Sequence, residues 1–192
     1  MSTNSVLKNF NKKPVHERSS LETKFKNSRY NLLLVVAFTL INLVLLISDT
    51  DTFFLFSAYI PYGIVDIGML MCGKYPAKFY QQNAIAETLD PSAFIGFIII
   101  AAIIVLLYLA CWFFSRKVKT GWLVFALIIF IIDTIALVFI FGFESDNIVD
   151  IIFHVWVIAS LIMGISAGSK LKKLPPEEEE EQEAFVDCAE LE

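Results

Sequence analysis

Long runs of apolar residues, separated by short polar connections, are the dominant pattern of this chain. Four runs approach the roughly 20 residues that a helix needs to cross a bilayer. They lie at about 31–48, 94–114, 122–143 and 148–167. A helix satisfies its backbone hydrogen bonds internally, as a segment in hydrocarbon must. The pattern therefore predicts an all-α integral membrane protein built as a four-transmembrane-helix bundle.

A fifth apolar stretch, residues 53–72, lies within the long connection 49–93. It is interrupted by a proline, an acid and two glycines, namely Pro61, Asp66, Gly63 and Gly68. A fifth span would also move one group of basic residues to the outer side of the membrane. We therefore expect 49–93 to be an outer loop that contains a re-entrant or interfacial hairpin. A true fifth span is the alternative.

Lysines and arginines outside the apolar runs predict the orientation of the chain. They gather in residues 1–30, between the second and third runs, and after the fourth run: Arg116, Lys117, Lys119, Lys170, Lys172 and Lys173. The connection 144–147 carries two acids and no base. Short basic connections stay in the cytoplasm. We therefore expect a cytoplasmic basic tail at 1–30, the transmembrane domain at 31–168, and a cytoplasmic C-terminal tail at 169–192.

The composition agrees with a membrane location. Hydrophobic residues make up 57% of the chain and the mean hydropathy is +0.67, whereas soluble domains contain roughly 45–50% apolar residues. The net charge of −5 comes from residues 174–192, which hold nine acids and no base. We expect this acidic tail to be disordered. No cleavable signal sequence is recognisable, and the small size suits a multi-pass protein of a bacterial cell membrane.

Asp133 carries the sharpest functional hint, because it is the one charged residue in the third apolar run. A carboxylate in hydrocarbon is costly, so it should face the bundle interior and find a partner. Asn42 lies at a similar depth, roughly 15 Å from the inner boundary at 1.5 Å per residue, and is the expected partner. Two interpretations stay open. Asp133 contacts an ion, proton or substrate, or it is a neutral carboxyl that donates one hydrogen bond between helices.

Asp150 and His154 are four residues apart in the fourth run, so they share one face of its helix. Asp150 could orient the imidazole for proton transfer, or both could ligate a metal, although a metal site needs further ligands. The structural alternative is an acid near a helix N-terminus, where the helix dipole favours negative charge, with a histidine satisfied inside the bundle.

Small residues recur every fourth position at the end of the fourth run, at Ser160, Gly164 and Gly168. Such a row permits close approach of a second helix. The row therefore predicts helix packing, either between spans of one chain or between two copies.

Motifs for cofactors and for catalytic nucleophiles are absent from the chain, including the P-loop, HExxH, GxSxG and GxGxxG. The three cysteines, Cys72, Cys111 and Cys188, contain no CxxC pair. They therefore predict neither a disulfide framework nor a zinc site. We expect no cofactor, no metal and no nucleic-acid partner. The expected partners are the lipid bilayer, a second copy of the chain, or another membrane protein.

These patterns favour a non-catalytic membrane component that acts through partners, such as an accessory subunit, assembly factor or sensor. The alternative is a small transporter or channel subunit that uses the intramembrane carboxyl of Asp133. An intramembrane enzyme is the third class, and the missing nucleophile and metal motifs argue against it.

Overall fold

The computed structural model describes residues 4–50, 52–54, 56–85, 87–141 and 148–175. Every regular element in these ranges is helical. The elements are α1 (Asn4–Ile47), α2 (Tyr59–Met71), α3 (Ala77–Gln82), the 3-10 turn η1 (Pro91–Ala93), α4 (Phe94–Phe114), α5 (Thr120–Phe141) and α6 (Ile148–Leu171). The predicted all-α class is confirmed for this part of the chain. The predicted turn at 144–147 and the acidic stretch 176–192 lie outside the described residues.

Four helical segments are long and apolar enough to cross a membrane: Glu17–Ile47, Pro91–Phe114, Thr120–Ile140 and Ile148–Leu171. They carry large apolar side chains on their outer surfaces. Phe139, for example, is 90% exposed. Apolar surface of this kind costs about 25 cal/mol per Å² in water, so a four-helix bundle with this surface is suited to lipid.

The first long helix begins earlier than the start near residue 31 that hydropathy predicts. α1 is continuous from Asn4 to Ile47. Its earlier part is not uniformly polar, because Leu21 and Phe25 are buried in the core cluster together with Leu171 of α6. Packing against α6 therefore accounts for α1 as far back as Leu21.

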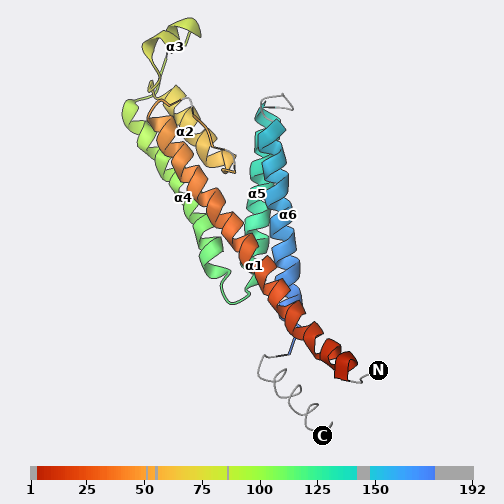
Figure 1. Cartoon of the computed structure of the whole chain (residues 1–192). Coiled ribbons are helices and arrows are strands. Elements are labelled where there is room, and N and C mark those ends of the chain that lie inside the picture. The colour runs from red at the N-terminus through yellow and green to blue at the C-terminus, as the bar shows by residue number, and fades with distance from the viewer. Residues whose placement is uncertain (1–3, 51, 55, 86, 142–147, 176–192) are drawn as a thin grey trace.

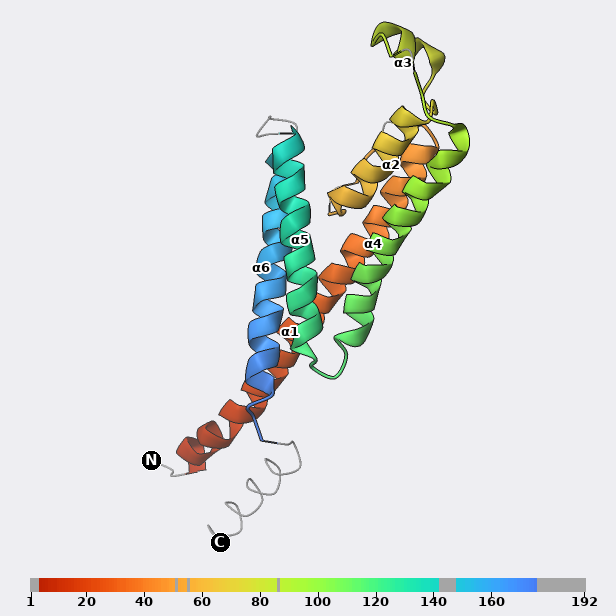
Figure 2. The same ribbon diagram turned by 180° about the vertical axis from the view of Figure 1, so that it is seen from behind.

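Figures 1 and 2 show that α1 joins two groups of helices. α5 and α6 lie side by side, and α1 crosses α6 near the N-terminal end of the molecule. α2 and α4 lie along the remaining part of α1, and a short connection after α4 leads into α5. The buried core includes Leu32, Val35, Leu123, Phe130 and Leu161.

Two glycines of α6 allow α1 to approach closely. A Cβ atom on Gly164 would lie 2.3 Å from Cβ of Ser28. A Cβ atom on Gly168 would lie 2.9 Å from the ring of Phe25. Ser160, one turn earlier, accepts a 2.6 Å hydrogen bond from Nδ2 of Asn31. The row of small residues therefore faces α1 of the same chain.

The fifth apolar stretch forms a helix that is too short to span a membrane. α2 has 13 residues, which corresponds to about 20 Å against a hydrocarbon core of about 30 Å. Pro61 lies in its first turn, where a missing N–H costs no internal hydrogen bond. The alternative of a fifth span at 53–72 is therefore not supported. The N-terminus of α2 lies beside α5, and its C-terminus lies near the ends of α1 and α4 (Figure 2).

Candidate functional site at the N-terminus of α2

Polar side chains of α1 hold the backbone that leads into α2. Nδ2 of Asn42 donates to the carbonyl oxygen of Phe54 at 2.7 Å and to Oγ of Ser57 at 2.8 Å. Oδ1 of Asn42 accepts the N–H of Phe54 at 2.8 Å. Oγ1 of Thr39 accepts the N–H of Ala58 at 2.8 Å. Thr39 and Asn42 are both buried, so these bonds replace the water that the backbone would otherwise need.

Asp133 of α5 caps α2 from a neighbouring helix. Its Oδ2 atom accepts the N–H of Tyr59 at 2.8 Å, and its Oδ1 atom accepts the N–H of Ile60 at 2.7 Å. The first N–H groups of a helix have no partner within the helix. The preceding residue, Ala58, provides no side-chain cap. The carboxylate therefore supplies a cap that the local sequence lacks, and the helix dipole stabilises its negative charge.

His154 of α6 completes the site. Its Nε2 atom lies 3.3 Å from Oδ2 of Asp133, and its Nδ1 atom lies 2.8 Å from the backbone carbonyl oxygen of Asp150. The side chains of His154 and Asp133 are 3% and 1% exposed. The pair thus joins α5, α6 and the start of α2 in a site closed to solvent.

The geometry requires one shared proton between the two side chains. A carbonyl oxygen only accepts hydrogen bonds, so Nδ1 of His154 carries a hydrogen. Nε2 then faces Oδ2 of Asp133, and one proton must lie between these atoms for a favourable contact. Because two backbone N–H groups already donate to Asp133, the negative carboxylate is stabilised.

Aromatic rings enclose this site. The ring of Phe130 stacks on His154 with centroids 5.0 Å apart and an interplanar angle of 17°. Phe56 lies just before α2 with φ at 70°, a conformation that is rare for a bulky residue. Its ring is 3.8 Å from that of Phe153 and 5.5 Å from that of Trp156, centroid to centroid. These contacts offset the strain at Phe56 and fix the path of the connection.

The sequence-derived candidates are brought together in an unexpected way. Asn42 and Asp133 do not pair with each other in the hydrogen bonds of the described residues. Asn42 instead binds Phe54 and Ser57, and Asp133 binds Tyr59 and Ile60 at the start of α2. Asp150 contacts His154 through its backbone carbonyl, whereas sequence reasoning considered its carboxylate. Ser160, Gly164 and Gly168 lie elsewhere on α6, at the contact with α1.

Sequence reasoning missed the residues that Asp133 binds, because both contribute only backbone N–H groups. Composition cannot reveal such a partner. One signal was available, since Thr39 and Asn42 are three residues apart and present polar groups on one face of the first apolar run. Within the described residues, no group of three His, Cys, Asp or Glu side chains could hold a metal ion. The contacts that Asp133 makes at this site are two hydrogen bonds from backbone N–H groups and the close approach of Nε2 of His154.

Comparison of this chain with protein-family models, with curated proteins and with solved structures finds no match.

Proposed function

We propose that this chain is a four-span integral membrane protein with a re-entrant half-helix, and that it is a non-catalytic component that acts through partner proteins. The single observation that carries the proposal is the saturation of Asp133 by protein groups. Both carboxylate oxygens accept backbone N–H groups of α2, and one also faces His154. A carboxylate used in this way positions α2 and has little capacity left for a substrate.

The re-entrant geometry is supported by the length and direction of α2. A 13-residue helix whose N-terminus meets the interior of α5 reaches only partway across a bilayer. Its backbone at that depth is covered by Asn42, Thr39 and Asp133, and irregular backbone within a membrane is tolerated where protein buries it. The outer loop 49–93 would then enter and leave the membrane on one side.

The orientation follows from charge. Lys26 and Arg29 of α1, and Arg116 after α4, lie at the same end of the bundle as the N-terminus. Lys78 of α3 lies at the opposite end (Figure 1). By the positive-inside tendency, the first end is cytoplasmic and α3 is external, in the cell membrane of a bacterium. Both termini are then inside.

A labelling experiment tests this arrangement. Lys78 or Lys119 is replaced by cysteine in a chain whose three native cysteines are alanine, and an impermeant maleimide is added to intact cells. Lys78→Cys should be labelled, and Lys119→Cys should be labelled only after the cells are opened. Labelling of Lys119→Cys in intact cells would show that the orientation is the opposite of the one proposed. Loss of the chain from the membrane fraction in alkaline carbonate would refute membrane integration itself.

The partner-dependent role is tested by isolation of the full chain from its own membrane in a mild detergent. The expected result is a complex of fixed stoichiometry that contains a second protein or a second copy. A chain that is isolated as a monomer, and that moves ions or protons across liposomes, would contradict the non-catalytic role.

One observation favours the second candidate, a proton-dependent transporter or channel subunit. Asp133 and His154 share one proton in a buried site, and intramembrane acid–histidine pairs occur in proton relays. Under this candidate, Asp133→Asn abolishes proton movement into liposomes that contain a pH-sensitive dye. Under the first candidate, wild type and Asp133→Asn give the same slow baseline.

A further inference from the structure

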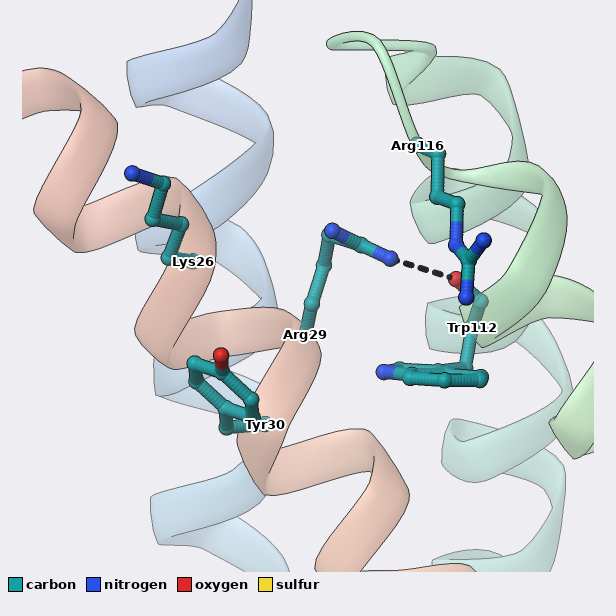
Figure 3. Close-up of a pocket in the computed structure, with 5 residues that line it drawn as sticks. All are labelled: Lys26, Arg29, Tyr30, Trp112 and Arg116. Atoms are coloured by element: carbon teal, nitrogen blue, oxygen red, sulfur yellow. Dashed lines mark hydrogen bonds between the residues drawn. The ribbon is translucent and has the colours of Figure 1, made fainter.

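A pocket separate from the Asp133 site lies at the proposed cytoplasmic end of the bundle. It has a volume of about 240 Å³ and is lined by Lys26, Arg29, Tyr30, Trp112 and Arg116. The first three residues belong to α1, Trp112 belongs to α4, and Arg116 follows α4. Figure 3 shows the Arg29 side chain extending from α1 toward Trp112 and Arg116, whereas the amine of Lys26 points away from the two guanidinium groups in this view. Three cationic side chains and two aromatic ones therefore border one cavity.

The two arginines are held close together by the α4 end. Nε of Arg29 donates to Oγ of Ser115 at 2.9 Å, and Nη2 donates to the carbonyl oxygen of Trp112 at 3.1 Å. The guanidinium carbons of Arg29 and Arg116 lie 5.7 Å and 5.3 Å from the centroid of the Trp112 ring. Two like charges so close to one ring repel each other, so the site is organised for a negative ligand.

The pocket also contains hydrogen-bond donors that the protein leaves without an acceptor. Arginine has five N–H groups, and the bonds above use two of those on Arg29. Among the described residues, no carboxylate forms an ion pair with Arg29, Arg116 or Lys26. Nε1 of Trp112 is buried and has no hydrogen-bond partner in the described chain. Figure 3 shows this nitrogen on the edge of the ring that points toward α1. A ligand rich in acceptor oxygens matches these donors.

The surroundings indicate where such a ligand comes from. Tyr30 and Phe113, beside the pocket, are 63% and 48% exposed. Aromatic side chains of this kind are typical of the headgroup level of a membrane. Basic pockets between spanning helices on the cytoplasmic side bind anionic lipid headgroups. An acyl chain would continue along the exposed apolar surfaces of α1 and α4.

We propose that this pocket binds the phosphate of an anionic diacyl phospholipid in the cytoplasmic leaflet. The phosphate oxygens accept hydrogen bonds from Arg29, Arg116 and Nε1 of Trp112, and Lys26 adds a further positive charge. Bound lipid would bridge α1 and α4, which the hydrogen bonds of Arg29 already join here. This assignment rests on the membrane location proposed above.

The test uses the purified full chain in detergent, so that the acidic C-terminal residues can compete for the basic groups if they reach them. Phosphatidylglycerol, phosphatidylcholine and inorganic phosphate are added separately, and bound molecules are counted by native mass spectrometry. Phosphatidylglycerol should bind at least about 10-fold more tightly than phosphatidylcholine, because the pocket favours net negative charge. Inorganic phosphate should bind far more weakly than the lipid.

Arg116→Gln is the informative variant, because the side chain of Arg116 makes no hydrogen bond among the described residues and its loss should leave the fold intact. It should weaken phosphatidylglycerol binding about 10-fold. Lys119→Gln removes the same charge from the same connection but does not line the pocket, so it should change binding less than about twofold. Unchanged thermal unfolding of both variants shows that each remains folded.

Three results would overturn the assignment: equal binding of the two lipids, an unchanged preference in Arg116→Gln, or inorganic phosphate binding as tightly as the lipid. The last would reassign the pocket to a soluble phosphate compound. Alkaline carbonate extraction of the membranes from which the chain is purified separates these failures from failure of the membrane proposal. A chain that remains integral without a lipid preference refutes only the pocket assignment.

Discussion

The backbone N–H of Tyr59, the first residue of α2, donates a 2.8 Å hydrogen bond to Oδ2 of Asp133 on α5. These residues are 74 positions apart in the chain. The bond fixes the start of α2 inside the bundle, where no water is available to the helix end. Removal of the carboxylate should therefore affect the position of α2 more than it affects α5 itself.

Replacement of Asp133 by leucine should lower the free energy of unfolding by about 2–5 kcal/mol, because it leaves two backbone N–H groups and His154 without an acceptor. The measurement is reversible unfolding in mixed detergent micelles. Thr134→Val is the matched control, since Oγ1 of Thr134 bonds only to the carbonyl of Phe130 in its own helix. It should cost less than about 1 kcal/mol. If both variants lower the free energy of unfolding equally, the cap that Asp133 provides does not stabilise the fold more than an ordinary hydrogen bond within one helix.

Asp133→Asn should be destabilising too, although the two side chains have nearly the same size. Asparagine has one carbonyl oxygen, and its amide group would face either the N–H of Tyr59 or that of Ile60 as a second donor. We expect a loss of about 1–3 kcal/mol, the cost of one buried donor without a partner. An Asn variant as stable as wild type would show that the cap on α2 does not need both carboxylate oxygens of Asp133.

Gly164→Ala should weaken the contact between α1 and α6. The added Cβ would lie 2.3 Å from Cβ of Ser28, so the helices must separate, at a cost of about 1–3 kcal/mol. Gly96→Ala in α4 is the control, because an added Cβ there meets nothing within 4 Å. The control should be neutral or stabilise the helix by up to about 1 kcal/mol. Comparable destabilisation by both substitutions would argue against close α1–α6 packing.

Tyr75 should make stability depend on pH in the alkaline range. Burial and the hydrogen bond from its hydroxyl to Asp66 raise the pKa of Tyr75 above its ordinary value of 10.0. The unfolded phenol therefore ionises first. The stabilisation is complete below pH 10 and is lost as the pH rises through the folded pKa.

The measurement compares wild type with Tyr75→Phe by unfolding between about pH 8 and pH 11. The stability advantage of wild type should decline above about pH 10, because phenylalanine cannot ionise. Parallel curves for the two proteins would show that Tyr75 is not held by Asp66.

The four long helices could be predicted because each apolar run is itself close to the length of a bilayer span. The start of α1 could not be predicted, because Leu21 and Phe25 are too widely spaced among charged residues to raise the local hydropathy. Their burial depends on α6, which lies more than a hundred residues later. The length of α2 was likewise set by tertiary contacts, in that the helix begins where Asp133 offers a cap.

The sequence could predict that Asp133 and His154 belong to the candidate site. It could not predict which groups they bind. A lone aspartate in an apolar helix and a histidine near the start of the next one are conspicuous in the sequence. Asn42 was expected to be the partner of Asp133 only because both residues should lie at a similar depth in the membrane. Depth cannot show that another segment lies between two helices, and here residues 56–60 occupy that place.

The central claim is that α2 enters the membrane with its N-terminus held at Asp133, and the most direct test is the depth of nitroxide labels along α2. Labels are attached at Ile60, Ile67 and Met71 in a chain whose three native cysteines are alanine. Their contact with dissolved oxygen and with a water-soluble nickel reagent is then measured in bilayers. At 1.5 Å per residue, Ile60 should lie up to about 16 Å deeper than Met71, and Asp133→Leu should reduce this difference. A label at Ile60 that is as accessible to the nickel reagent as the label at Met71 would contradict the account.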